Sequence, residues 1–114
     1  MTAPAAEAYA QRPRQRGIPV PRYLVQRNFG RVDDEHMKIR STRSTELIDN
    51  RFTDITWEHS HVVTTPDGDV KTFCIYRSPS ESLVHEHAEA LGGHTIEVIF
   101  EIGGDVDPDD FRKH

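Results

Sequence analysis

The chain has 114 residues, an apolar fraction of 35% and a formal net charge of −5. This length suffices for one domain with a modest core, and the negative charge excludes a broad basic surface for nucleic acid or an anionic membrane. One cysteine excludes an intramolecular disulfide framework, and the sequence has neither a membrane-spanning apolar stretch nor a secretory signal, so we expect a cytoplasmic protein.

The two ends of the chain differ in composition from its middle. Residues 1–21 are rich in proline and have no sustained apolar period, which predicts a flexible N-terminal arm. Residues 103–114 are dominated by aspartate and predict an acidic C-terminal tail. The folded domain is therefore expected at residues 22–102.

The folded part begins with a strand and a helix. Residues 22–29 alternate in polarity and predict a first strand that ends at Gly30. Asp33 and Asp34 then offer an N-cap and negative charge in the first turn, which predicts a helix through about Asp49.

A β-hairpin is predicted next, because two β-rich runs, residues 55–63 and 70–76, flank a Pro-Asp-Gly turn. Alternation places His59 and His61 on one strand face, together with Ile55, Trp57 and Val63.

The register of this hairpin decides which side chains meet. With Asp67 and Gly68 as the two central turn residues, Cys74 lies opposite His61, and Tyr76 lies opposite His59. A three-residue loop with a bulge would shift the register by one residue. Phe73 and Ile75 would then share the histidine face, and Cys74 would move to the other face.

A second helix has clear end signals. Ser78, Pro79 and Glu81 fit an N-cap, an N1 proline and an N3 carboxylate, and Gly92 fits the position after the last turn. His87 falls on the apolar stripe of this helix.

The last predicted strand spans residues 95–102. Its alternation predicts that Ile96, Val98, Phe100 and Ile102 point inward. The element order β-α-β-β-α-β is that of the α+β ferredoxin-like fold, a four-stranded antiparallel sheet with two helices on one face. Because the other face is left uncovered and the hairpin has apolar residues on both sides, we expect a homodimer through the open sheet face.

The hairpin and the second helix supply a set of possible metal ligands: His59, His61, Cys74 and His87. Nitrogen and sulfur donors suit nickel, copper or zinc. The alternative is structural: His59 and His61 pack on Trp57 and Tyr76, and Cys74 acts as a small buried apolar residue.

Several short blocks of this sequence resemble one known family. They are Pro21 to Val25, Thr56-Trp57, His59-Ser60, Val62, Lys71 to Tyr76, Ser78-Pro79-Ser80 and His87-Ala88. Together they resemble the small bacterial ferredoxin-like proteins grouped under a nickel-binding domain of unknown function, over about residues 21–102. The resemblance implies a ferredoxin-like fold, a dimer and nickel binding by at least one member.

The residues that match the polar blocks of the family are Trp57, His59, Ser60, Cys74, Tyr76 and His87. His61 departs from the family, which often has an aromatic residue there.

The function expected from these features is binding of a divalent transition metal, most plausibly nickel, for sequestration, delivery or sensing. His59 and Cys74 are the expected ligands, with His61 and His87 as further ligands. One alternative is a dimeric α+β barrel enzyme in which Tyr76 or a histidine moves a proton on a small organic substrate. A third is a partner-binding module whose terminal tails carry recognition.

Overall fold

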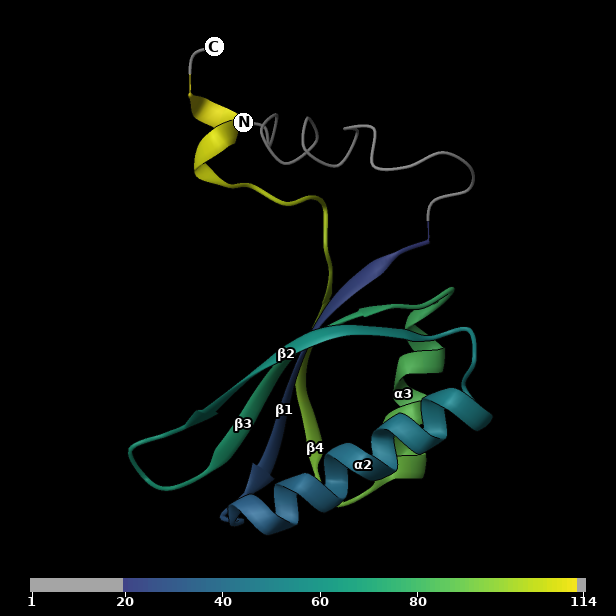
Figure 1. Ribbon diagram of the computed structural model, residues 1–114, viewed down its shortest axis with the longest axis vertical. Helices are drawn as coiled ribbons and strands as arrows, with labels where there is room; N and C mark the ends of the chain where they lie inside the picture. The colour runs from purple at the N-terminus through teal and green to yellow at the C-terminus, as the bar shows by residue number, and fades with distance from the viewer. Residues whose placement is uncertain (1–19, 113–114) are drawn as a thin grey trace. The chain divides into compact units, whose positions relative to one another are not determined.

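The computed structural model describes residues 20–112, so all but the last two residues of the predicted N-terminal arm lie outside the described residues. Residues 20–101 form one compact unit (Figure 1). Its elements are β1 (Arg22–Gly30), α2 (Asp34–Asn50), β2 (Thr56–Thr64), β3 (Val70–Arg77), α3 (Glu81–Leu91) and β4 (Thr95–Glu101). Residues 102–112 lie outside this unit and contain a short 3-10 helix, η1 (Pro108–Phe111), capped by Asp107.

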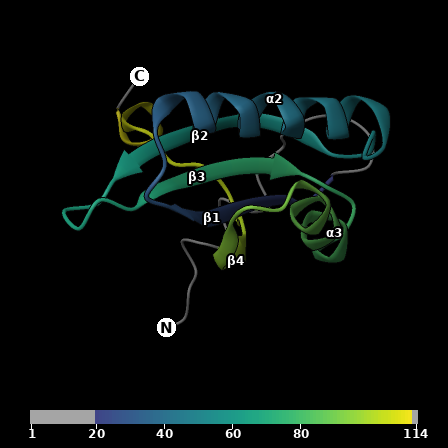
Figure 2. The same ribbon diagram turned by 90° about the horizontal axis from the view of Figure 1, so that it is seen from below.

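The strands form one antiparallel sheet in the order β2-β3-β1-β4, which Figure 2 shows in succession. This order, with the two helices, confirms the predicted ferredoxin-like fold. None of the helices within residues 20–112 has the length and apolar character needed to cross a bilayer.

Both helices pack on the same face of the sheet. Val25 and Cys74, which are paired on β1 and β3, belong to one buried core with Leu47 of α2 and with Val84 and Leu91 of α3. Paired residues on neighbouring strands share a face, so this side is the covered face and the opposite side is the open face.

The helix ends follow local capping chemistry. Asp33 caps α2 as expected, because its carboxylate accepts a hydrogen bond from the His36 N–H at 2.8 Å. The N-cap of α3 is Ser80, which accepts from the Leu83 N–H, so the prediction of Ser78 as N-cap is wrong. Ser78 is fully buried, and its hydroxyl donates to the Ser80 carbonyl at 2.8 Å.

The hairpin turn has three residues in its loop rather than two. The Thr65 N–H donates to the Asp69 carbonyl (2.8 Å), and the Gly68 N–H donates to the Thr65 carbonyl (2.9 Å). Gly68 has a φ of +95°, as expected for a type I turn followed by a glycine bulge.

This loop pairs Cys74 with Ser60, Phe73 with His61 and Ile75 with His59. The predicted pairing of Cys74 with His61 is wrong, and the alternative register, shifted by one residue, is confirmed.

Bulges in the two edge strands change which residues face the helices. The register of β2 shifts between Trp57 and His59, so Trp57 lies opposite Tyr76 on the covered face and His59 lies on the open face. The expectation that Trp57 shares a face with the histidines is therefore wrong. A similar shift in β4 places Val98 and Phe100 on the open face, against the prediction that they point inward, and Phe100 is 62% exposed.

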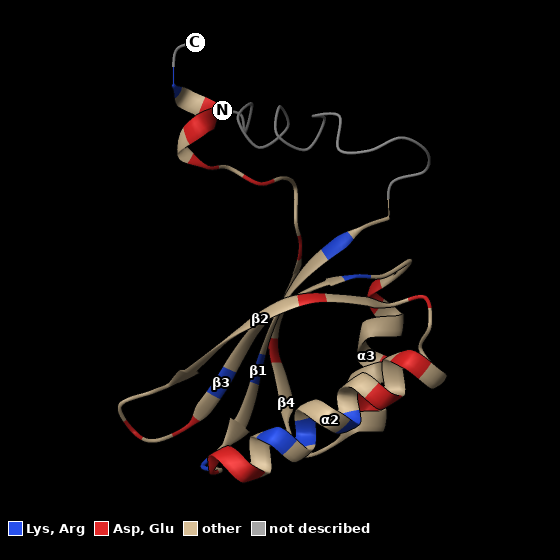
Figure 3. Cartoon of the chain, viewed as in Figure 1, with Lys and Arg blue, Asp and Glu red and all other residues tan. Residues whose placement is uncertain are grey.

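A glutamate occupies each bulge. Glu58 accepts hydrogen bonds from Arg22 (3.0 Å) and Arg77 (2.6 Å), and Glu97 forms an ion pair with Lys71 (3.0 Å). Burial by itself raises the pKa of Glu58, but the hydrogen bonds from the two arginines outweigh burial and hold this pKa below its usual value. Figure 3 shows acidic positions on β2 and β4 beside basic positions on β3 and β1. The bulges thus place glutamates where neighbouring strands supply cations.

Candidate functional site

His59 and His61 form an exposed pair on the open face. They lie opposite Ile75 and Phe73, and their ring centroids are 5.4 Å apart with the ring planes almost perpendicular. Two imidazoles bound to one ion at about 2.0–2.1 Å have centroids roughly 5 Å apart, so this spacing suits a shared metal. Both rings are accessible to an ion in solution.

Cys74 lies on the opposite side of the sheet from this pair. Its side chain is 3% exposed, and its thiol donates to the Thr72 hydroxyl at 3.3 Å. The expectation that nitrogen and sulfur donors of the hairpin converge is wrong within one protomer, because the three-residue loop places Ser60 opposite Cys74. Within residues 20–112 no group of three or more His, Cys, Asp or Glu side chains is arranged to hold a metal ion.

His87 is fully buried on the covered face, in agreement with its predicted place on the apolar stripe of α3. Its Nδ1 lies 3.3 Å from Nη2 of Arg27, and its Nε2 lies 3.1 Å from the Ser44 hydroxyl. Because a guanidinium can only donate, Nδ1 accepts and the Nε2–H donates to Ser44. Both nitrogens are therefore engaged within the protein, and neither offers a free lone pair to a metal.

The environment of His87 keeps its imidazole neutral. Burial, followed by the positive charge of Arg27, lowers the pKa of His87 from 6.5 to about 4. A neutral imidazole agrees with the hydrogen bonds of His87, which require one nitrogen that accepts and one that donates. Burial also raises the pKa of the Tyr76 phenol, which packs near His87 with ring centroids 6.0 Å apart.

The sequence reasoning missed Arg27, a buried cation at the centre of this cluster. Arg27 is 2% exposed, its Cζ lies 5.0 Å from the centroid of the Tyr76 ring, and its Nε has no hydrogen-bond partner. The period of two along β1 could have predicted this burial, because Arg27 lies on the same strand face as the buried residues Tyr23 and Val25.

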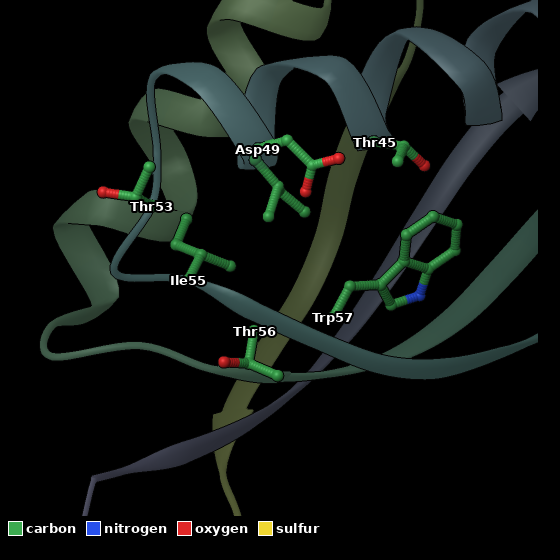
Figure 4. Close-up of a pocket in the computed structure, with 7 residues that line it drawn as sticks. Thr45, Asp49, Thr53, Ile55, Thr56 and Trp57 are labelled. Carbon is green, nitrogen blue, oxygen red and sulfur yellow. The ribbon is translucent and has the colours of Figure 1, made fainter.

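A hollow of about 440 Å³ lies between the C-terminal half of α2 and the start of β2 (Figure 4). Asp49 on α2 overlies Ile55 and Trp57 there, and three threonines complete its polar lining. The hollow contains neither Tyr76 nor a histidine, the residues that the enzyme hypothesis requires to move a proton.

The fold and the surface define a class of protein: a small ferredoxin-like α+β domain with a histidine pair on an open sheet face. The chain belongs to the family described as nickel responsive protein SCO4226-like, whose model matches residues 23–102.

The fold also resembles the solution structure of the C-terminal domain of the MgtC protein from Mycobacterium tuberculosis. The TM-score is 0.50 at 9% identity, over 76% of this chain and 90% of that chain, so the likeness concerns the fold alone. No curated protein matches the sequence.

Proposed function

We propose that this protein binds nickel through His59 and His61 and serves in nickel sequestration, delivery or sensing. The observation that carries the proposal is the exposed imidazole pair with ring centroids 5.4 Å apart, in a chain whose family is nickel responsive. Imidazole nitrogen is a suitable donor for Ni²⁺.

The open face supports a homodimer as the binding form. Phe100 is 62% exposed and Val63 is 39% exposed, and Leu24, Phe73 and Ile75 on the same face are only half-buried. An apolar surface beside polar groups is typical of a protein interface, and a two-fold axis would supply a second histidine pair. A second pair can complete a coordination sphere that one pair leaves open.

The test is a nickel titration by calorimetry of tag-free protein, comparing wild type with a His59→Ala, His61→Ala double variant. We expect the double variant to lose at least about tenfold in nickel affinity, which corresponds to about 1.4 kcal/mol. His85→Ala is the matched control, because His85 is an exposed histidine on α3.

Nickel affinity that is equal in wild type and in the double variant would refute the assignment of these ligands. Sedimentation of the same samples would test the dimer, which is expected to persist in the His85→Ala protein.

A further inference from the structure

A small cavity lies beneath α2 on the covered face, on the opposite side of the sheet from the proposed nickel site. Its volume is about 50 Å³. Its polar lining includes Arg27, Ser44, Ser60, Thr72, Cys74 and Tyr76. Ser41 and Val62 also line it and are exposed, so the cavity reaches the surface between α2 and β2.

The charge of Arg27 lacks a counter-ion in the described part of the chain. Arg27 is 2% exposed, and within residues 20–112 its guanidinium contacts the neutral imidazole of His87 and the face of the Tyr76 ring. Its Nε–H is buried without a hydrogen-bond partner. Buried charges in proteins are normally paired, since an isolated buried ion is costly to remove from water.

Hydrogen-bond directions around the cavity leave donors facing it. The Ser44 hydroxyl oxygen accepts from the His87 Nε2–H, and the Ser60 hydroxyl accepts from the Trp57 Nε1–H at 2.8 Å. The Thr72 hydroxyl likewise accepts from the Cys74 thiol. The Ser60 and Thr72 hydroxyls therefore still have their own hydrogens to donate, whereas the Ser44 hydroxyl also hydrogen-bonds the Tyr76 phenol.

The cavity lining includes no carboxylate, and a second cation, Arg40, also contributes to it. The Arg40 Nη1 donates to the Leu91 carbonyl at the end of α3 (2.8 Å), but its Nε, like that of Arg27, is buried without a hydrogen-bond partner. Positive charge therefore remains in the cavity lining for an anionic ligand.

We propose that this cavity binds a small monocarboxylate, or the carboxylate head of a larger organic acid that enters between α2 and β2. The planar guanidinium of Arg27 would hold the carboxylate, and the hydroxyls of Ser60 and Thr72 would donate to it. A volume of about 50 Å³ accommodates an anion of the size of formate or acetate. This site is independent of the proposed nickel site.

The only tryptophan of the chain reports on this site, because Trp57 lines the cavity. Purified full-length protein is titrated with sodium formate or sodium acetate, with sodium chloride replaced to keep the ionic strength constant, and Trp57 fluorescence is recorded. We expect a saturable change for the carboxylates, with affinity in roughly the millimolar range for so small a ligand. A series of longer monocarboxylates then distinguishes a free small anion from the head of a larger acid, because only the latter gains affinity with chain length.

Substitutions connect the response to the cavity. Arg27→Met keeps the length of the side chain and removes the charge, so we expect at least about a tenfold loss of acetate affinity. Arg43→Met is the matched control, because the Arg43 side chain is 53% exposed on α2. The His59→Ala, His61→Ala variant should retain the acetate response, because its substitutions lie on the open face.

Two outcomes would overturn the proposal. One is an equal, saturable response to chloride, and the other is a response that Arg27→Met leaves unchanged. If Arg27→Met does not fold, Thr72→Val decides by the same titration. Loss of affinity by several fold then supports the site, and unchanged affinity rejects it.

Discussion

Histidines lie on both sides of the sheet, buried on the covered face and exposed on the open face. On the covered face, His87 is fully buried between Arg27 and Ser44, with both ring nitrogens engaged. On the open face, His59 and His61 are exposed and lie beside each other. A histidine on the covered face therefore serves the fold, whereas the pair on the open face is available to a ligand.

This difference shows that burial decides whether a histidine in this protein is available to a ligand. Burial lowers the pKa of His87 to about 4 and keeps its proton on one nitrogen. The sequence prediction grouped the three histidines as ligands of one metal, whereas the structure places them on opposite sides of the sheet. The following predictions test this separation, beginning with the largest expected effect.

Truncation of apolar side chains should affect stability on one face only. Leu47 is 5% exposed in the core under the covered face, so Leu47→Ala should lower the free energy of unfolding by about 2–5 kcal/mol. Phe100→Ala removes a larger side chain from the open face, yet it should change monomer stability by no more than about 0.5 kcal/mol. Urea unfolding at low protein concentration measures both values.

The same two variants should also differ in their effect on dimerisation. If the open face forms the proposed dimer, Phe100→Ala should weaken dimerisation in sedimentation experiments, and Leu47→Ala should do so only through unfolding. Equal losses of monomer stability in the two variants would contradict the division into a covered and an open face.

The second prediction concerns pH. The unfolded chain binds a proton at His87 near pH 6.5, whereas the folded chain does so only near pH 4. The contribution of neutral His87 to stability is therefore complete above pH 6.5 and is lost as the pH falls toward 4. The slope is at most about 1.4 kcal/mol per pH unit. His87→Gln should remove this slope, because glutamine can accept from Arg27 and donate to Ser44 without titrating.

The measurement is the difference in unfolding free energy between wild type and His87→Gln across this pH range. The acidic groups Glu58 and Glu97 titrate in both proteins, so their effects largely cancel in the difference. His94 is coupled to His87, because its charge also lowers the pKa of His87. A difference that does not change with pH would mean that His87 is accessible to protons in the folded chain.

Much of the fold could be predicted because its signals are local. Each of four signals acts within a few residues of the chain. They are the alternation in β1, the Asp33 cap of α2, the apolar stripe that buries His87, and Gly92 at the end of α3. Together with the element order they define the ferredoxin-like topology. Where a strand has no bulge, the alternation of its side chains then predicts which residues face the helices.

The faces of the edge strands could not be predicted, because they depend on irregular positions. The positive φ of Gly68 selects a three-residue loop, and the shifts near Glu58 and Glu97 each exchange the two faces of a strand. The cations that pair with these glutamates come from other strands, including Arg22 and Lys71, so no local pattern reveals them. The face of Cys74 relative to the histidines depended on the choice between a two-residue and a three-residue loop, and the sequence left both registers open.

The smallest effect is expected where the sequence hypothesis placed a ligand. Cys74 is 3% exposed on the covered face, and the sheet lies between it and the histidine pair. Cys74→Ala should therefore leave the nickel affinity of the folded protein unchanged, while lowering stability moderately through lost packing. Calorimetric titration with nickel measures the affinity, and alkylation of the thiol with and without nickel provides an independent reading.

The outcome of this experiment separates two kinds of site. Unchanged affinity, together with alkylation that nickel does not slow, would confine metal binding to the open face. A loss of affinity close to that of the His59→Ala, His61→Ala protein would instead require the hairpin to exchange its register when metal binds, because sulfur and imidazole can meet only if one strand turns over. The three-residue loop closed by Thr65 and Asp69 opposes such an exchange, so we expect the first outcome.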